Sequence, residues 1–260
     1  MKKTYRICRI LRFLTGKRRP YTAAILLAGG TGSRMQSVDG TTKQLMQLED
    51  APVLIHAARA LDACPYIDDI VVVARKEELH TVDGLMHTYG ICKYRKVVPG
   101  GETRQYSALA GFEATDGEKV RYVAIHDAAR CMVTPDMIAD VVAAAYACGG
   151  ATAACRVTDT VKRATPDGYV KETLDRETLW AAQTPQVFSA DLYRAAAYTA
   201  VKAGFSATDD VMLCERIGQA VKLVDCGSEN FKITTAPDLL RAAQILRRRR
   251  EESESGAKKC

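Results

Sequence analysis

AAILLAGGTGSR, residues 23–34, joins an apolar run to a loop that contains three glycines and ends in Arg34. The run from Ala23 to Leu27 predicts a buried strand. If that strand belongs to a parallel sheet, the loop lies at the carboxyl ends of the strands, where ligands bind. Glycines let backbone amides approach phosphate oxygens closely, and an arginine can pair with two of those oxygens. The stretch therefore indicates a phosphate site, although a strand-to-helix turn would also use such glycines.

Short apolar runs alternate with amphipathic stretches of helical length from Tyr21 onward. Strands are predicted over 23–27, 69–74, 94–98, 121–125, 151–157 and 221–224. Helices are predicted over 53–63, 77–89, 104–114, 135–148, 189–203, 209–217 and 237–249. This alternation is typical of an α/β protein with a mainly parallel twisted sheet flanked by helices.

The alternation breaks over residues 158–178, where two polar, alternating runs flank the turn sequence Thr165-Pro166-Asp167-Gly168. This pattern predicts a protruding β-hairpin arm. Because such an arm cannot bury a face of its own, we expect it to pack on a second copy of the chain and to form a homodimer.

The composition favours one domain with charged ends. The chain has 260 residues, 47% of them hydrophobic, which is enough for one substantial core. Its net charge of +6 comes from the ends, because residues 1–20 carry +8 and residues 241–260 carry +4, which leaves −6 for 21–240. A face that binds nucleic acid is normally part of the folded domain, so no nucleic-acid partner is expected. We predict a basic N-terminal extension at 1–20, one domain at 21–246 and a charged C-terminal tail at 247–260.

The sequence favours a cytoplasmic protein over one that associates with membranes. No stretch approaches the roughly 18 consecutive apolar residues that a membrane-spanning helix needs. Residues 1–19 could form a surface-lying membrane helix, but arginines interrupt their apolar face, and we favour a solvated extension. The nine cysteines include no Cys-x-x-Cys pair, which argues against structural zinc and favours reduced, mostly buried thiols.

Lys43 adds a second cation to the edge that carries the glycine loop, nine residues after Arg34. The loop lacks the lysine of the Gly-x-x-x-x-Gly-Lys-Ser/Thr phosphate loop and the acidic residue that a dinucleotide fold needs about twenty positions further on. Two flexible cations beside a glycine loop are suited to a polyphosphate.

Two further motifs follow predicted strands. Gly100-Gly101-Glu102-Thr103-Arg104-Gln105-Tyr106-Ser107 opens a helix, so its amides and Ser107 can contact a base, although Glu102 and Thr103 could simply cap the helix. His126-Asp127-Ala128-Ala129-Arg130 places a carboxylate at the same edge of the sheet. One carboxylate beside a triphosphate is sufficient for Mg²⁺, so Asp127 could hold a magnesium ion or a ribose hydroxyl.

Later motifs carry a more specific resemblance. They are Thr158-Asp159-Thr160-Val161-Lys162-Arg163, Leu174-Asp175-Arg176 with Leu179-Trp180, Gln183-Thr184-Pro185-Gln186-Val187-Phe188, Thr208-Asp209-Asp210 and Asn230-Phe231-Lys232-Ile233-Thr234. Together with the three motifs above, they resemble the 2-C-methyl-D-erythritol 4-phosphate cytidylyltransferases of the non-mevalonate isoprenoid pathway, over about residues 22–246.

The resemblance implies a Rossmann-like nucleotidyltransferase fold that binds CTP and a small phosphorylated polyol. The products would be 4-diphosphocytidyl-2-C-methyl-D-erythritol and pyrophosphate. The catalytic residues implied are Arg34 and Lys43 at the α-phosphate, with Arg176 and Lys232 positioning the substrate phosphate for in-line attack. The nucleotide would be bound by Ala28, Gly29, Gly30, Gly32, Gly101, Ser107, Asp127 and Ala128. The polyol phosphate would be bound by Thr160, Arg130 and Thr184, Mg²⁺ by Asp127, and each arm would complete the neighbouring subunit's site.

Two positions depart from the family pattern, because Thr42 and Cys131 stand where proline is usual. Both changes soften a loop without removing a charge. Cys131 lies beside Arg130, so we expect a lowered thiol pKa and sensitivity to alkylation. Two alternatives stay open at this point. One is a ribitol 5-phosphate cytidylyltransferase, and the other is a non-catalytic nucleotide-binding regulator.

Overall fold

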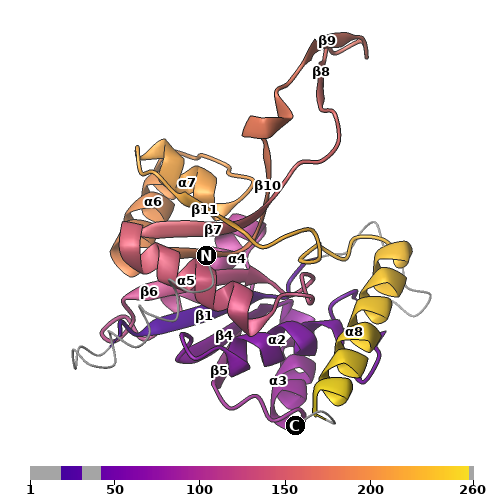
Figure 1. Ribbon diagram of the computed structural model, residues 1–260. Helices are drawn as coiled ribbons and strands as arrows, with labels where there is room; N and C mark the ends of the chain where they lie inside the picture. Colours follow the sequence, from indigo (N-terminus) through magenta and orange to yellow (C-terminus); the bar gives the residue numbers. More distant parts are fainter. Residues whose placement is uncertain (1–18, 31–41, 258–260) are drawn as a thin grey trace.

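A seven-stranded sheet forms the centre of the computed structural model, which describes residues 19–30 and 42–257 (Figure 1). Its strand order is β11-β7-β10-β6-β1-β4-β5. The central strand β1 (Thr22–Leu27) is parallel to β6 (Tyr122–Asp127) on one side and to β4 (Asp69–Ala74) on the other. The next strand, β5 (Tyr94–Pro99), is parallel to β4. The predicted α/β fold with a mainly parallel sheet is confirmed.

Helices cover both faces of the sheet, which explains why every residue of β1 is buried (Figure 1). Ala24 and Leu26 face one apolar core, and Ile25 faces the other. The first core is covered by α2 (Val53–Ala63), α3 (Leu79–Thr88) and α5 (Pro135–Cys148). The second is covered by α4 (Arg104–Glu113), α6 (Ala190–Lys202) and α7 (Asp210–Arg216). The bounds of α2 and α5 are those predicted from the sequence.

One strand of the sheet was not predicted. β10 (Trp180–Ser189) lies between β6 and β7 (Gly150–Arg156) and is antiparallel to both, while β11 (Lys222–Asp225) adds to β7 in parallel. The residues of β10 form a polar motif with a proline and not an apolar run. The register shifts between Ala182 and Gln186, and such an irregularity is where a sheet tolerates a proline inside a strand.

The predicted arm is present as a hairpin of β8 (Lys162–Ala164) and β9 (Val170–Thr173), followed by the short helix η2 (Arg176–Thr178). Figure 1 shows it standing clear of the helices and the sheet. Every residue of both strands is exposed, and so are the large side chains of Tyr169 and Val170. The hairpin thus buries no face within its own chain.

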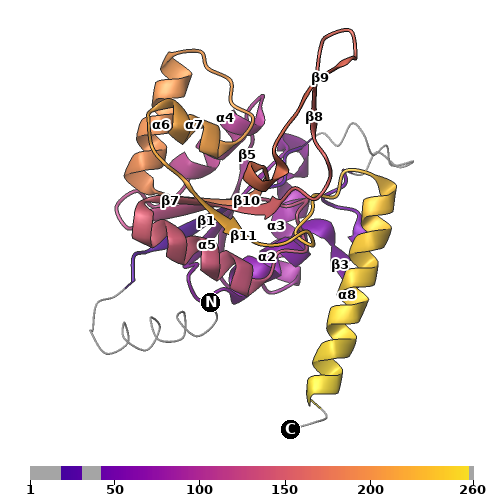
Figure 2. The ribbon, with the colours of Figure 1, turned by 45° about the horizontal axis from the view of Figure 1, so that its top comes forward.

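The last helix, α8 (Ala236–Ala257), runs along the side of the body, as Figure 2 shows. It is longer than the predicted helix, which ended near Arg249. A pair between Arg248 and Glu252, 3.7 Å apart at spacing i and i+4, supports the extra turns. α8 also contacts a small hairpin of β2 (Gln47–Leu48) and β3 (Ala51–Pro52), which is too short to give a sequence pattern.

Within the described ranges, no helix is both long enough and apolar enough to cross a membrane. The predicted basic extension lies, up to residue 18, outside the described residues, and the domain boundaries at 20 and 246 stay predictions.

Candidate active site

The glycine loop begins where β1 ends. Ala28 donates its backbone N–H to the carbonyl of Val73 on β4, at 2.7 Å, and Gly29 and Gly30 follow. Gln44, buried beneath the loop, donates to the carbonyl of Gly30 at 3.2 Å. A Cβ on Gly30 would lie 3.1 Å from that amide nitrogen, so glycine lets Gln44 support the loop closely. Sequence reasoning missed this contact.

Two residues predicted for the first motif, Gly32 and Arg34, lie outside the described residues. Lys43 follows this stretch and is buried, with 8% of its surface exposed. Its Nζ donates to the carbonyl of Ile233, at 3.1 Å, although 190 positions separate the two residues. Lys43 is thereby held against the segment that carries Lys232.

The second motif forms the start of α4. Thr103 caps the helix by accepting the N–H of Tyr106 at 3.3 Å, as one interpretation of the motif expected. A Cβ on Gly101 would lie 2.5 Å from the Cβ of Tyr106, so only glycine fits there. Ser107 donates to the carbonyl of Thr103 at 2.9 Å. Gly101 and Ser107 are therefore held close together at the start of α4.

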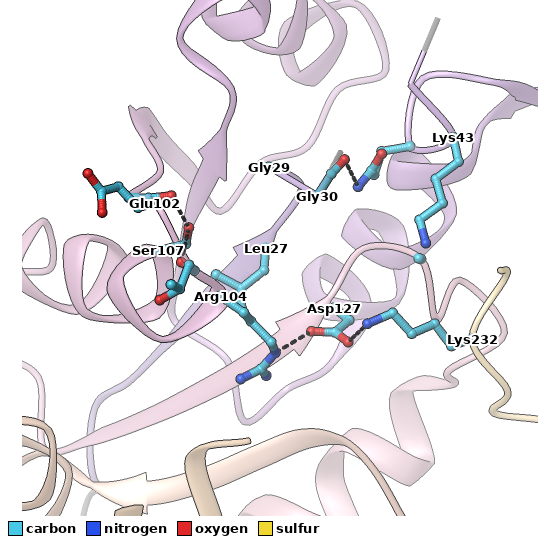
Figure 3. A pocket seen from close by; sticks show the side chains of 13 residues that line it. Leu27, Gly29, Gly30, Lys43, Glu102, Arg104, Ser107, Asp127 and Lys232 are labelled. Atoms are coloured by element: carbon cyan, nitrogen blue, oxygen red, sulfur yellow. Dashed lines mark hydrogen bonds and ion pairs between the residues drawn. The ribbon is translucent and has the colours of Figure 1, made fainter. Parts of the chain in front are cut away.

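The third motif places Asp127 at the end of β6 between two cations. Figure 3 shows Arg104 and Lys232 approaching its carboxylate from opposite sides. Lys232 Nζ donates at 2.6 Å and Arg104 Nε donates at 3.1 Å. Burial alone would raise the pKa of Asp127, but the two cations outweigh burial and hold that pKa well below its ordinary value. Asp127 is therefore ionised.

Arg104 was missed as a site residue, although it lies within the second motif. It also pairs with Asp210 of α7, 2.7 Å from Nη1 to Oδ2. Burial alone would lower the pKa of Arg104, but the two carboxylates outweigh it, and the pKa is raised. Arg104 therefore links the second motif, the third motif and α7 in one partly buried network.

Behind Asp127, His126 and Thr184 are buried and contact each other. The Thr184 hydroxyl accepts the N–H of Asp127 and lies 3.0 Å from His126 Nδ1. His126 Nε2 is 3.2 Å from the carbonyl of Arg130. Burial lowers the pKa of His126 to about 4, so the imidazole is neutral at physiological pH. His126 therefore supports Asp127 through the hydroxyl of Thr184.

Arg130 uses its guanidinium to bind two backbone carbonyls. Its Nη1 donates to the carbonyl of Asn230 at 2.9 Å, and its Nη2 donates to the carbonyl of Ala182 at 3.2 Å. Asn230 in turn donates to the carbonyl of Thr184, at 2.9 Å. Arg130 therefore ties β6, β10 and the segment before Lys232 together.

These elements enclose a cavity of about 260 Å³ at the carboxyl ends of β1 and β6 (Figure 3). It is lined by Leu27, Gly29, Gly30, Lys43, Gln44, Gly101, Glu102, Thr103, Arg104, Ser107, Asp127, Ala129 and Lys232. The structure thus brings together seven of the predicted site residues, from all three motifs and the C-terminal segment.

Other predicted residues lie outside this lining. Ala28 and Ala128 are buried beside it, and Ala128 donates its N–H to the carbonyl of Leu27 at 3.0 Å. Thr160 and Arg176 are exposed on the arm, where Arg176 donates to the carbonyl of Thr158 at 3.1 Å. Within its own chain the arm therefore does not bring these two residues to the cavity.

The expectation for Cys131 is wrong. Its side chain is buried in an apolar cluster with Met132 and Ile233, and only 3% of the residue is exposed. Burial raises the pKa of the Cys131 thiol to about 12, so the neighbouring arginine does not produce a reactive thiolate.

Comparison with known proteins identifies the family. The sequence model of the 2-C-methyl-D-erythritol 4-phosphate cytidylyltransferases matches residues 22–248. The chain belongs to this family. It is 42% identical over 228 residues to the family member of Pelotomaculum thermopropionicum, covering 87% of this chain and 94% of the relative. It is 38% identical over 231 residues to that of Syntrophus aciditrophicus, covering 88% and 97%.

Solved structures of the family share the fold. The 4-diphosphocytidyl-2C-methyl-D-erythritol synthase of Anaerococcus prevotii superposes with a TM-score of 0.77 at 27% identity, over 88% of this chain and 99% of that one. The 2-C-methyl-D-erythritol 4-phosphate cytidylyltransferase of Thermus thermophilus gives 0.69 at 27% identity, over 86% and 98%. The nucleotidyltransferase fold inferred from the motifs is confirmed.

Proposed function

We propose that this chain transfers the cytidylyl group of CTP to 2-C-methyl-D-erythritol 4-phosphate. An oxygen of the polyol phosphate attacks the α-phosphorus of CTP, the bond from that phosphorus to the bridging oxygen of the β-phosphate breaks, and pyrophosphate leaves. The observation that carries the proposal is the convergence of Lys43, Lys232 and the glycine loop on one cavity of a family member.

Charge neutralisation is the main task of such a site, because phosphoryl transfer needs positioning and electrostatic stabilisation more than a protein nucleophile. Lys43 and Lys232 supply two cations from adjacent segments, while Gly29 and Gly30 let backbone amides approach the phosphates. Arg34 would add a third cation from outside the described residues. Gly101 and Ser107 then bound the side on which the cytidine would lie.

Asp127 orients Lys232 through their 2.6 Å hydrogen bond and can accept a ribose hydroxyl. Both of its oxygens already accept from cations, so Asp127 fits Mg²⁺ only as a single ligand beside substrate phosphates. No group of three acidic, histidine or cysteine side chains among the described residues could hold a metal without them. When bound, Mg²⁺ supplies further positive charge to the triphosphate.

In this proposal, the arm of a second subunit completes the binding site for the polyol phosphate. Arg176 and Thr160 are exposed on a hairpin that buries nothing of its own chain, so a homodimer would bring them to the partner's cavity. Arg176 would then bind the polyol phosphate, with Arg130 and Thr184 supporting the wall beneath it. A cytoplasmic location is supported by the seven described cysteines, which are all free thiols.

The deciding experiment is pyrophosphate release from CTP with 2-C-methyl-D-erythritol 4-phosphate and, in parallel, with ribitol 5-phosphate. We expect turnover with the first acceptor only, because the relatives named above are methylerythritol phosphate enzymes. Preference for ribitol 5-phosphate would establish the alternative acceptor. Binding of CTP without turnover of either acceptor would favour a regulator instead.

A further inference from the structure

Helix α8 packs against both segments that carry the lysines of the cavity. Its residues Ala242 and Ile245 share an apolar cluster with Leu48, five positions after Lys43, and with Ile233, which follows Lys232. Figure 2 shows the first part of the helix beside the body and its C-terminal turns projecting past it. α8 is therefore the element that the two lysine segments have in common.

The segment of Lys232 has little regular structure to hold it. Residues 226–235 form neither strand nor helix, so their position depends on specific contacts. One is the N–H of Ile233, which donates to the carbonyl of Ala129 at 2.8 Å. Another is Glu229, three positions before Lys232, whose carboxylate is held by α8.

Both oxygens of Glu229 are taken by arginines of α8. Arg248 lies 2.5 Å from Oε1, and Arg249 lies 3.0 Å from Oε2. Arg249 also donates through Nη1 to the carbonyl of Met132, at 2.9 Å. The planar fork of Arg249 therefore ties the Lys232 segment to the loop after β6, which a lysine at 249 could not do equally well.

Arg247, one position before Arg248, binds the segment that follows Lys43. Arg247 pairs with Glu49 in the β2–β3 turn, 2.8 Å from Nη2 to Oε1, and Glu49 has a left-handed backbone with φ of 53°. Glycine or asparagine would adopt that conformation at lower cost. A glutamate at this position is therefore best explained by its carboxylate, which reaches Arg247.

We propose that Arg247, Arg248 and Arg249 are positioning residues that fix the distance between Lys43 and Lys232. One turn of α8 holds Glu49 on the Lys43 side and Glu229 on the Lys232 side. The direct link between the two sides, Lys43 Nζ to the carbonyl of Ile233, then keeps its 3.1 Å length. This role rests on the proposed function, in which both lysines act on the transferred phosphoryl group.

These partly exposed ion pairs contribute little to folding stability, so geometry is their main effect. A 1 Å misplacement in an active site can lower turnover by about 10²-fold, and a smaller shift of Lys232 by on the order of tenfold. We therefore expect Glu229→Gln and Arg249→Gln to lower kcat about tenfold, with a melting temperature close to that of the unmodified chain. Arg249→Lys should recover part of the loss.

Arg250→Gln is the matched control, because like Arg249→Gln it removes one positive charge from α8. Arg250 lies 3.6 Å from Asp50, and both side chains are about half exposed (54% and 49%). The shorter Arg247–Glu49 pair still holds the β2–β3 turn in this variant, and Glu229 keeps both of its arginines, so the variant should keep its kcat. Equal kcat values for Glu229→Gln, Arg250→Gln and the unmodified chain would overturn the proposal. So would a loss of kcat that merely followed a loss of folded protein.

Amide hydrogen exchange tests the positioning without turnover. The amide of Ile233 should exchange faster in Glu229→Gln than in Arg250→Gln, while amides of the central sheet stay unchanged. If the unmodified chain released no pyrophosphate from CTP, the proposed function would fail, yet faster exchange would still demonstrate that α8 holds the segment. Unchanged exchange at Ile233 in an active enzyme would refute the inference alone.

Discussion

The guanidinium of Arg104 lies 2.7 Å from the carboxylate of Asp210, which is 106 positions further along the chain and has a side chain only 1% exposed. Burial raises the pKa of Asp210, and Arg104 offsets only part of this. Because Arg104 also pairs with Asp127, one partly buried cation serves two buried carboxylates. The start of α4, the end of β6 and the start of α7 are thereby joined at the wall of the cavity.

Replacing Arg104 with methionine should destabilise the protein strongly. Asp127 keeps its pair with Lys232, but the buried carboxylate of Asp210 loses Arg104, and leaving a buried charge unpaired costs up to about 3–5 kcal/mol. Urea unfolding at neutral pH measures the loss. Arg163→Met is the control, since its partner Glu172 lies on the exposed arm. Equal unfolding free energies for the two variants would contradict the buried network.

Lys43→Ala should abolish most turnover while the fold remains intact. Removing one well-placed charge from a transition-state site costs on the order of 10² to 10³ in kcat. Pyrophosphate release measures kcat, and circular dichroism checks the fold. Lys222→Ala, on the exposed surface of β11, should behave as the unmodified chain. Near-normal turnover of folded Lys43→Ala would remove Lys43 from the mechanism.

Stability should fall between pH 6.5 and pH 4 because of His126. Burial lowers the pKa of this imidazole from 6.5 to about 4 in the folded protein. Over that window the unfolded chain binds a proton that the folded chain does not, so acid favours unfolding, by up to about 3 kcal/mol. The stabilising contribution is complete above pH 6.5 and is lost as the pH falls towards 4.

The pH dependence is tested by urea unfolding of His126→Asn across this window. The variant should lose the slope that the unmodified chain shows, whatever its absolute stability. His87→Asn, on the exposed surface of α3, should keep the slope. If both variants retain it, the loss of stability in acid has another origin.

Mixing two inactive variants tests the shared site. Lys43→Ala disables the cavity of its own chain, whereas Arg176→Ala disables the arm that we expect to complete the partner's site. A mixed dimer has one intact site, so random exchange of subunits should restore roughly a quarter of the unmodified activity. No recovery, under conditions where exchange is shown by mass spectrometry, would mean that the arm serves its own chain.

The sequence predicted the central parallel strands well because β1, β4 and β6 are buried on both faces. β4 contains an unbroken apolar run from Ile70 to Ala74, and its bounds of Asp69 to Ala74 are those predicted. β10 escaped prediction for the opposite reason. Its central residues Gln183 and Thr184 use their side chains for buried hydrogen bonds, so the strand lacks the periodicity of a core element.

The sequence predicted those lining residues of the cavity that belong to short local motifs. Lys43, Asp127 and Lys232 each belong to a short polar motif next to an apolar run, and they do meet at one cavity. Arg104 and Gln44 were missed because their roles depend on partners far along the chain or across a loop. An arginine at the first position of a helix gave one usable signal, since a cation is unfavourable there without a nearby anion.

The irregular stretch of β10 has a mechanical consequence. Arg176 at the base of the arm and Thr184, whose hydroxyl holds the amide of Asp127, are eight positions apart on one continuous piece of chain. Between Ala182 and Gln186 the ladder to β7 is interrupted, and such an irregularity allows a strand to bend locally. We therefore expect a displacement of the hairpin to be transmitted along β10, through the hydroxyl of Thr184, to the amide of Asp127.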